Sequence, residues 1–389
     1  MTNFTVRILD EDREETFEET FLSDGSPMDG SSFAIEDIEA GGRYVRISIP
    51  EQYLSLAEVQ VFGLVFDGDL GFNRQLRTDV GEEMLGRNAS AFLRMPFDAE
   101  NPEALVQVGT TADGTPALLN RHIVEADLRI VTGFIEPHFF AGFSGGVKGI
   151  MPGCAGLETV MSNHGAKNIG DPRATFGVTD GNPLWEELRD IALKTGPSFV
   201  LNVTLNEQRD ITNVFAGDIL EAHRAGCAFV KRSAMQPVEQ PFDIVVTTNS
   251  GYPLDLNLYQ GVKGMSAGAR VLKEGGTLIL AAECREGVPG GSPLDELLRS
   301  AGSTEEILAK LSMPGFVRPE QWQAQIQALV QRKAEVLVHS LLDEKTVAAC
   351  HLKSCPDISA EVASRLNAEG PETRLAVLPQ GPLTIPYLA

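Results

Sequence analysis

From about Arg77 onward, short apolar runs alternate with amphipathic stretches along the chain. Several runs are continuously apolar, which is typical of strands covered on both faces of a sheet. Strands are expected at 104–109, 128–133, 198–205, 243–249, 277–282, 335–340 and 374–379. Helices are expected between them at 183–195, 218–232, 293–311 and 320–333. The pattern predicts an α/β protein with mostly parallel sheets.

The first 66 residues have a different pattern. Residues 1–40 are acidic and rich in turn formers, so a solvated lead-in is expected there. Two short runs follow at 43–49 and 57–63, in which apolar and polar residues alternate as half-buried strands require. Together they resemble the closing strands of a discoidin-type β-sandwich, of which this length holds only a fragment.

A linker is expected at 235–241, which carries two prolines and no apolar period. It would separate two α/β lobes. The chain is therefore predicted to have three parts, a β-appendage at 1–66, an N-terminal α/β domain at 67–236 and a C-terminal α/β domain at 237–389.

Composition and charge narrow the possible function classes. The 389 residues include 32 Lys and Arg against 54 Asp and Glu, a formal net charge of −22 that repels phosphate backbones and anionic lipid. No stretch approaches the roughly 20 apolar residues of a membrane span. The five cysteines are too scattered for a disulfide scaffold or a zinc site. We expect a cytoplasmic protein that binds neither nucleic acid nor membranes.

The most unusual segment is the glycine-rich loop at 133–156, GFIEPHFFAGFSGGVKGIMPGCAG. Glycine at this density lets the backbone approach a ligand closely and exposes amide donors to anions. A plain surface loop is the alternative, but such loops are usually polar and this one is threaded with phenylalanines. The loop is therefore the first candidate for a ligand site.

Two histidines and a lysine accompany this loop. His138 follows a predicted strand end, where open α/β sheets place their ligands, and His164 lies 26 residues later with Lys148 between them. One histidine could act as a base near neutral pH and the other as a metal ligand, although a buried structural histidine is the alternative for each. The other four histidines are expected to be structural or surface residues, at positions 122, 223, 339 and 351.

The same loop also contains the pattern G-x-S-x-G at 142–146. This pattern would make Ser144 the nucleophile of a hydrolase, with Asp255 and His339 as later partners. That motif demands a strand directly before the serine, whereas the predicted strand ends at Gly133. A serine hydrolase therefore stays a minor alternative.

A second set of polar residues follows the predicted strand at 243–249. Its members are Asp255, Asn257, Tyr259, Gln260 and Lys263. The last three fall on one face of a helix, which makes a set able to bind a carboxylate and a hydroxyl. An ordinary amphipathic helix with an exposed lysine is the alternative.

Two long motifs, at 132–164 and 250–268, closely resemble the nickel-dependent lactate racemase family, and the resemblance runs from about residue 71 to the end. It implies two α/β domains with the active site in the cleft between them. It also implies a racemase or epimerase of a lactate-like 2-hydroxy acid. The implied cofactor is a nickel-pincer nucleotide, pyridinium-3,5-bisthiocarboxylic acid mononucleotide with nickel, supplied by cofactor-synthesis enzymes.

By the same resemblance, Lys148 is the covalent attachment point of the cofactor and His164 ligates nickel. His138 acts as the catalytic base, while Gln260 and Lys263 position the substrate and Tyr259 lies beside them. Further cofactor contacts are expected near the lysine, from Phe140, Ser144, Gly145, Gly146 and Pro152. A base would remove the hydroxyl proton as the Cα hydride leaves, and return of the hydride to the opposite face would invert the centre.

The N-terminal motifs of that family have no clear counterpart. A D-x-T-R-P-type phosphate-binding motif is absent, and the G-T-H-R motif that supplies the second base is matched only by Gly71-Phe72-Asn73-Arg74. Asn73 cannot accept a proton at neutral pH. We therefore expect an incomplete N-terminal domain and a slow racemase. The alternative is a non-catalytic relative that binds a nucleotide or hydroxy acid without turnover.

Overall fold

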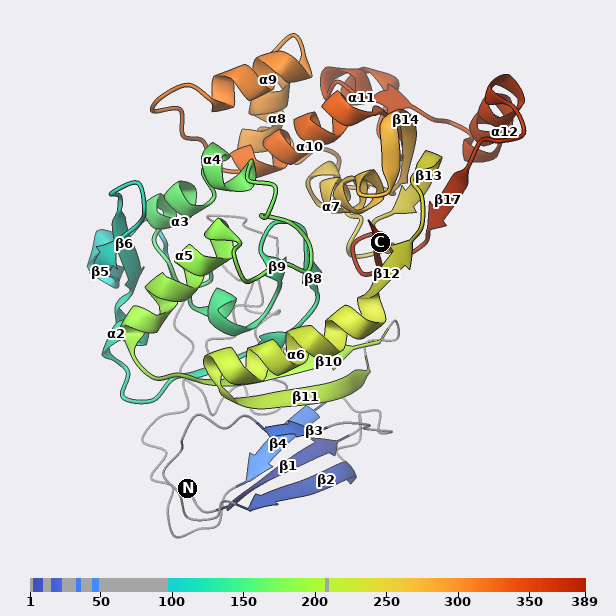
Figure 1. The fold of residues 1–389 in the computed structure, drawn as a ribbon. Coiled ribbons are helices and arrows are strands. Elements are labelled where there is room, and N and C mark those ends of the chain that lie inside the picture. The colour runs from blue at the N-terminus through green and yellow to red at the C-terminus, as the bar shows by residue number, and fades with distance from the viewer. Residues whose placement is uncertain (1–2, 10–14, 23–32, 36–43, 49–96, 207–209) are drawn as a thin grey trace.

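The computed structural model describes residues 3–9, 15–22, 33–35, 44–48, 97–206 and 210–389 (Figure 1). Before residue 97 it describes four strands by their backbone only. The strand expected at 57–63 and the motif around Asn73 lie outside the described residues.

The N-terminal lobe, residues 97–234, is built on a four-stranded sheet with the order β3-β11-β10-β7. Its strands are β3 (Phe33–Ile35), β7 (Ile130–Phe134), β10 (Phe199–Leu205) and β11 (Ile211–Asp218). β10 runs parallel to β7 but forms an antiparallel hairpin with β11, so this sheet is mixed. Two helices accompany it, α5 (Pro183–Ala192) and α6 (Ile219–Ala234), and α6 lies along β10 and β11 in Figure 1.

Shorter elements complete the N-terminal lobe. β5 (Leu105–Thr110) and β6 (Pro116–Asn120) form a hairpin. Three short helices are α2 (Arg121–Glu125), α3 (Leu157–Asn163) and α4 (Ala166–Ile169). The glycine-rich loop holds the two-residue strands β8 (Pro137–His138) and β9 (Gly142–Phe143) and the 3-10 turn η3 (Gly146–Gly149). Two more 3-10 turns are η2 (Pro102–Ala104) and η4 (Leu193–Thr195).

The C-terminal lobe, residues 242–378, has a five-stranded, fully parallel sheet with the order β16-β15-β14-β13-β17. Its strands are β13 (Phe242–Thr248), β14 (Leu272–Ala281), β15 (Glu335–His339), β16 (Lys353–Ser354) and β17 (Leu375–Leu378). Its helices are α7 (Leu258–Ala269), α8 (Pro293–Arg299), α9 (Thr304–Leu311), α10 (Gln321–Lys333), α11 (Glu344–Ala349) and α12 (Ile358–Glu369).

Both faces of the C-terminal sheet are covered, as its continuously apolar strands predict. Val245 and Leu278 belong to the main core, which also includes residues of α7 and α10. The alternate residues Val246 and Ile279 form a smaller cluster with Ile358 of α12. The expected α/β fold with mostly parallel sheets is confirmed.

Three elements differ from the expected pattern. The helix expected at 293–311 is two helices, because Gly302 intervenes and the Ser303 hydroxyl accepts a bond from Glu306 N (3.2 Å) to begin α9. The predicted linker contains the strand β12 (Met235–Val238), which pairs in parallel with β18 (Ile385–Leu388). The N-terminal segment forms an antiparallel sheet of order β2-β1-β4, from β1 (Asn3–Leu9), β2 (Glu15–Leu22) and β4 (Tyr44–Ser48).

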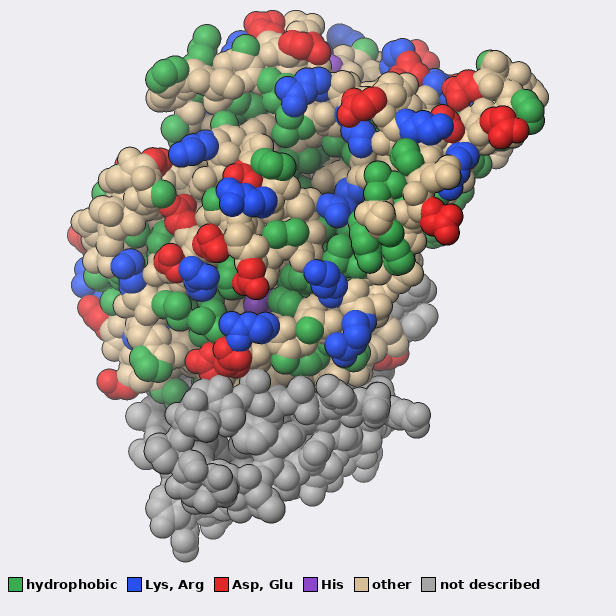
Figure 2. Space-filling view, in the orientation of Figure 1, with side chains coloured by type: hydrophobic (Ala, Val, Ile, Leu, Met, Phe, Trp, Pro, Cys, Tyr) green, Lys and Arg blue, Asp and Glu red, His purple; other side chains and the backbone are tan. Residues whose placement is uncertain are grey.

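Helix length and surface charge are relevant to the expectation that the protein binds neither membranes nor nucleic acid. None of the helices in the described ranges is long and apolar enough to span a membrane. On the face shown in Figure 2, basic and acidic side chains are interspersed rather than gathered into patches of one sign. The expected lack of nucleic-acid and membrane partners stays a prediction.

Helix α7 approaches the sheet through glycines. A Cβ added at Gly264 would lie 2.3 Å from the carbonyl oxygen of Thr248, and one at Gly268 would lie 3.0 Å from Leu278. A carbonyl oxygen of a central strand cannot move aside without breaking the sheet. The close approach therefore requires glycine at position 264.

We predict that Gly264→Ala lowers the free energy of unfolding by about 1–3 kcal/mol. Alanine in a helix interior normally adds about 0.5–1 kcal/mol of stability relative to glycine, so a loss shows that the clash outweighs helix propensity. Urea unfolding measures the change. Gly290→Ala is the control, since a Cβ there meets nothing within 4 Å. A stabilised Gly264→Ala protein would contradict the packing.

Candidate functional site

Glycines fit the 133–156 loop against the N-terminal lobe. A Cβ at Gly142 would lie 2.3 Å from Val178 O, and one at Gly149 would lie 2.4 Å from Val131 Cγ1. Gly142, Gly145 and Gly146 also have positive φ angles of 81°, 76° and 56°. Larger residues at these positions would clash or strain the backbone.

The amides of this loop are mostly used within the protein. Ser144 N donates to Glu136 O (2.9 Å), Gly146 N to the side chain of Asn202 (2.8 Å) and Lys148 N to Gly145 O (3.1 Å). The amides at these three positions, of which Gly146 is the one glycine, are therefore bonded within the protein and are not exposed to an anion. Cofactor contacts by Ser144, Gly145, Gly146 and the buried Pro152 stay predictions.

Ser144 is a structural serine in this conformation. Its hydroxyl donates to Phe134 O (2.9 Å) and accepts a bond from Glu136 N (2.8 Å). The side chain is only 2% exposed. Among the described residues, neither Asp255 nor His339 is one of its hydrogen-bond partners, and His339 Nδ1 instead contacts Cys355 O (2.8 Å). The geometry gives the hydrolase alternative no support.

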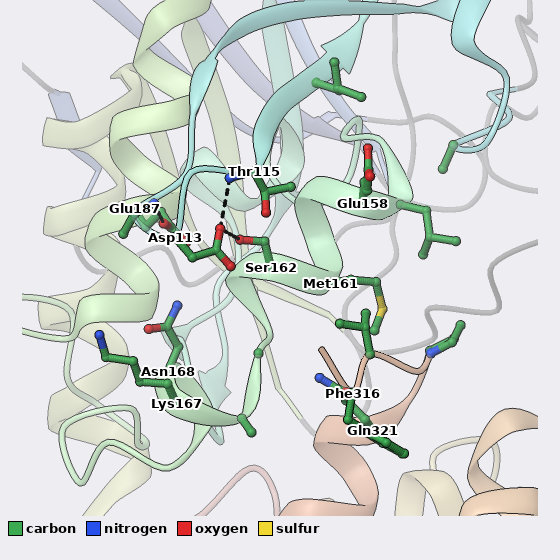
Figure 3. A pocket seen from close by; sticks show the side chains of 18 of the residues that line it. Asp113, Thr115, Glu158, Met161, Ser162, Lys167, Asn168, Glu187, Phe316 and Gln321 are labelled. Atoms are coloured by element: carbon green, nitrogen blue, oxygen red, sulfur yellow. Dashed lines mark hydrogen bonds between the residues drawn. The ribbon is translucent and has the colours of Figure 1, made fainter. Parts of the chain in front are cut away.

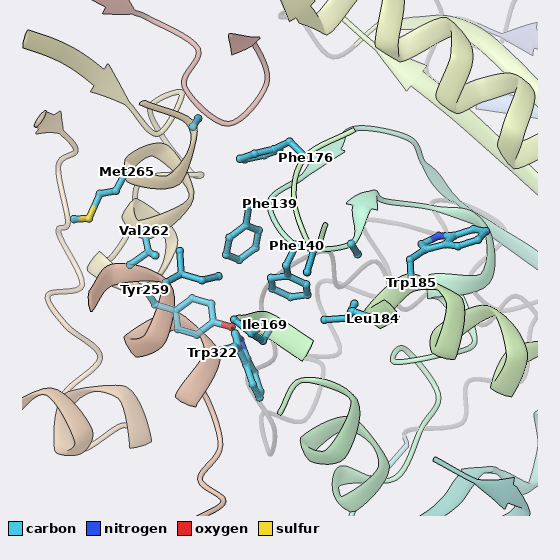
Figure 4. Packing of buried hydrophobic residues seen from close by; sticks show 14 of the residues in the cluster. Phe139, Phe140, Ile169, Phe176, Leu184, Trp185, Tyr259, Val262, Met265 and Trp322 are labelled. Atoms are coloured by element: carbon cyan, nitrogen blue, oxygen red, sulfur yellow. The ribbon is translucent and has the colours of Figure 1, made fainter. Parts of the chain in front are cut away.

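Aromatic rings bring the two predicted site histidines together. The His138 ring packs edge-on against Phe140 with centroids 4.4 Å apart, and Phe140 packs edge-on against His164 at 5.0 Å. On its other side His164 meets Trp322 of α10 at 5.1 Å. Figure 4 shows Phe140 and Trp322 at this boundary between the lobes. Both histidines are buried, so their surroundings control their protonation.

The backbone fixes the proton position on His138. Ala141 N lies 3.1 Å from Nδ1 and donates to it. A ring nitrogen that accepts a hydrogen bond is unprotonated, so the neutral ring carries its proton on Nε2. His138 is thus arranged as a proton donor at Nε2, and it can take up a proton only after the bond from Ala141 is broken or the ring is turned.

His164 is a neutral, deeply buried imidazole. Burial, with the positive charge of Lys148 acting in the same direction, lowers its pKa from 6.5 to about 3. Its Nδ1 is buried and has no hydrogen-bond partner among the described residues. A neutral ring nitrogen without a partner is suited to binding a metal ion.

The described residues contain no group of three or more His, Cys, Asp and Glu side chains able to hold a metal ion. His164 could therefore supply one ligand, while the remaining ligands would have to come from a bound group. The unpartnered Nδ1 of His164 therefore suits a metal ion whose other ligands belong to a bound cofactor.

The C-terminal residues of the predicted site lie on α7. Tyr259 is buried, and its hydroxyl accepts a bond from Trp322 Nε1 (3.1 Å), which joins α7 to the ring that covers His164. Gln260 is the next residue, and half-buried Lys263 lies one turn later on the same helix. Their roles in binding a substrate stay predictions.

Asp255 and Asn257, which were grouped with these residues, have structural partners. The side-chain oxygen of Asn257 accepts a bond from Gln260 N (3.1 Å) and so caps the start of α7. Asp255 accepts a bond from Glu283 N (3.0 Å). Asn257 and Asp255 therefore both stabilise the segment in which α7 begins.

A pocket of ≈ 920 Å³ lies beside this site (Figure 3). Its wall includes Asp113, Ser162 and Met161 from the N-terminal lobe and Phe316 and Gln321 from the C-terminal lobe. Hydrogen bonds from hydroxyl and amide groups lower the Asp113 pKa to about 2 although burial opposes this, so it is an anion at neutral pH. Within the described part of the chain, no predicted site residue lines this pocket. It adjoins the site through Gly165 and Gln321, the neighbours of His164 and Trp322.

Sequence reasoning missed three residues of this region. Trp322 lies in the run QWQAQIQ, where it is the only aromatic residue of a helix whose first four glutamines are buried. Asn202 and His223 contact the glycine-rich loop from β10 and α6. The isolated tryptophan was a usable signal, whereas nothing local marks Asn202 or His223.

Comparison with known proteins fits this arrangement. The sequence matches the family models of the lactate racemase N-terminal domain over 70–177 and of the lactate racemase C-terminal domain over 238–385. It is 37% identical over 320 residues to a lactate racemase of Thermoanaerobacterium thermosaccharolyticum, covering 80% of this chain and 74% of the relative. It is also 37% identical over 319 residues, with the same coverage, to a lactate racemase of Lactiplantibacillus plantarum.

The chain belongs to the lactate racemase family. Membership makes it an isomerase of the racemase type, and it confirms the resemblance seen in the sequence. The solved lactate racemase apoprotein of T. thermosaccharolyticum superposes with a TM-score of 0.77 at 34% identity, covering 81% of this chain and 76% of that one. A Thermotoga maritima protein at 22% identity has a TM-score of 0.62, covering 82% of this chain and 84% of that one, and supports the fold alone.

We predict that His164→Gln flattens the pH dependence of stability in this lactate racemase family member. The depressed pKa of His164 means that its contribution to stability is complete above pH 6.5 and is lost as the pH falls toward 3. The parent should therefore lose up to about 1.4 kcal/mol per pH unit more than the variant in that window. Urea unfolding at several pH values measures both curves. Parallel curves would contradict a buried, neutral His164.

Proposed function

We propose that the protein interconverts the enantiomers of lactate or a similar 2-hydroxy acid, with a nickel-pincer nucleotide attached to Lys148. The observation that carries this proposal is the continuous contact from His138 through Phe140 and His164 to Trp322. Through these contacts the rings of His138 and His164 and, by way of the Trp322–Tyr259 bond, helix α7 meet at one boundary, which supports a shared site. The relatives named lactate racemase support lactate as the substrate class.

When bound, such a cofactor supplies an acceptor for the Cα hydride of the substrate. The protein's own residues would hold it in two places. Lys148 offers an amine for covalent attachment, and the orphaned Nδ1 of His164 is a ready metal ligand. Burial of both histidines excludes water from the region in which charge would change.

Proton transfer in this proposal belongs to His138. Once the bond from Ala141 N to Nδ1 is broken or the ring is turned, the neutral imidazole could accept the hydroxyl proton of the substrate, and the imidazolium so formed would return a proton to the oxygen in the reverse direction. Lys263 and Gln260 on α7 would bind the carboxylate and orient the hydroxyl. A substrate would then be held by the C-terminal lobe and meet the proton-transfer group of the N-terminal lobe.

A non-catalytic relative is the second candidate, and the missing N-terminal motifs favour it. It would keep the pocket and lose turnover because Asn73 replaces a histidine base. Asn73 lies outside the described residues, so its position stays a prediction. We expect the protein to work in the cytoplasm, where the cofactor-synthesis enzymes would supply its cofactor.

We predict that protein produced together with cofactor-synthesis enzymes carries a covalent adduct at Lys148 and contains nickel. Intact-mass and peptide mass spectrometry locate the adduct, and elemental analysis measures the metal. Lys148→Arg keeps the positive charge but removes the nucleophilic amine, so it should abolish the adduct. Nickel-loaded protein with an unmodified Lys148 would refute this attachment.

His138→Asn should lower racemisation by a factor of about 10²–10⁴, the usual effect of removing a general acid or base. The Asn side-chain oxygen can still accept the bond from Ala141 N, so the loop is retained while proton transfer is lost. Chiral chromatography of enantiopure lactate measures the rate. His138→Ala is a harsher variant because the ring is buried against Phe139 and Phe140. Unchanged turnover in His138→Asn would remove this residue from the mechanism, and His122→Asn is the matched control.

A further inference from the structure

His223 of α6 lies under the glycine-rich loop and contacts it in two ways. Its Nε2 is 2.7 Å from the carbonyl oxygen of Ser144. A Cβ added at Gly146 would lie 2.6 Å from His223 Cγ, so the imidazole occupies the space that this glycine leaves open. The ring is only 2% exposed. The histidine and the loop therefore fit one another closely.

The environment of His223 fixes its state. Burial is the main cause that lowers its pKa to about 4, and the charge of Lys148 acts in the same direction. Because a carbonyl oxygen can only accept, the neutral ring must carry its proton on Nε2 and donate it to Ser144. The ring also stacks on Trp185 with an interplanar angle of 11°. His223 is thus held as an oriented, uncharged donor.

Asn202 of β10 contacts the same turn from another element. Its side-chain oxygen accepts a bond from Gly146 N (2.8 Å). A Cβ at Gly145 would lie 2.8 Å from that oxygen, so this glycine too is required by the contact. Two buried polar side chains from separate elements therefore hold the residues from Ser144 to Gly146.

The geometry points to His223 and Asn202 as positioning residues for Lys148. They clamp the backbone from Ser144 to Gly146, where the 3-10 turn that carries this lysine begins, and so fix the position from which its side chain extends. This inference rests on the proposed attachment of the cofactor at Lys148. We call His223 and Asn202 the clamp. It needs an uncharged hydrogen-bond donor at position 223, because a second positive charge there would repel Lys148.

The first test measures the amine without any cofactor. Isotope-labelled acetic anhydride is applied to the apoprotein, and peptide mass spectrometry gives the acetylation rate of Lys148 relative to exposed Lys167. His223→Leu should raise this relative rate about fivefold or more, the change expected from losing one buried hydrogen bond. His223→Gln retains a donor and should stay within about twofold of the parent. Asn202→Ala should also raise the relative acetylation rate of Lys148, and it replaces His223→Leu in this test if that variant does not fold.

Two controls separate positioning from general stability. His339→Gln alters another histidine bonded to a backbone carbonyl, in the other lobe, and should leave Lys148 unchanged. Ile123→Ala destabilises the same lobe from α2, where Ile123 is buried, and should lower Tm without altering the Lys148 rate. If Ile123→Ala changes the Lys148 rate as much as His223→Leu at an equal loss of Tm, the positioning role is refuted.

The second test uses protein produced with the cofactor-synthesis enzymes, and intact mass measures the adduct at Lys148. His223→Leu should lose most of the adduct, whereas His223→Gln should keep it. If the parent itself carries no adduct, the proposed function fails. The acetylation rates of the variants would still show whether His223 and Asn202 position Lys148. Equal acetylation and equal adduct in the parent and His223→Leu would overturn the inference.

Discussion

The edge-on contact between Trp322 and His164 is the interaction on which the site depends. It joins a helix of the C-terminal lobe to a buried imidazole whose Nδ1 has no hydrogen-bond partner among the described residues. Trp322 in turn donates to the Tyr259 hydroxyl, 63 positions earlier in the chain. Aromatic contacts of this kind exclude water and hold ring orientations, so the chemistry of the N-terminal lobe is completed by packing from the other lobe.

Charge in this region is arranged around one lysine. His164 and His223 are both uncharged because they are buried, and Lys148 disfavours their protonation further. Burial thus keeps both imidazoles uncharged in the region that contains Lys148, and a low-dielectric surrounding strengthens any electrostatic contact formed there.

The site residues that could be predicted are those that a short stretch of sequence marks by itself. Glycine density and the spacing of His138, Lys148 and His164 identified the loop without any knowledge of the fold. The contacts that hold the loop could not be predicted in this way, because His223 meets Ser144 across 79 positions and Asn202 meets Gly146 across 56. Likewise, four of the five strands of the C-terminal parallel sheet were evident as apolar runs, whereas the short strand β16 and the hairpin partner β11 were missed. The polar Asn213 of β11 is buried within the sheet and interrupts the expected pattern.

The pairing of β12 with β18 shortens the connection between the two lobes. β12 follows directly after α6, and the end of the chain returns to lie beside it, where Pro386 O accepts a bond from Arg270 of the C-terminal lobe (3.2 Å). The four residues of β12 are therefore paired with a strand that is itself bonded to the C-terminal lobe. A short connection with few free bonds keeps the two lobes at a high effective concentration near each other. The contact of Trp322 with His164 thus forms between two parts of the chain that are already held close together.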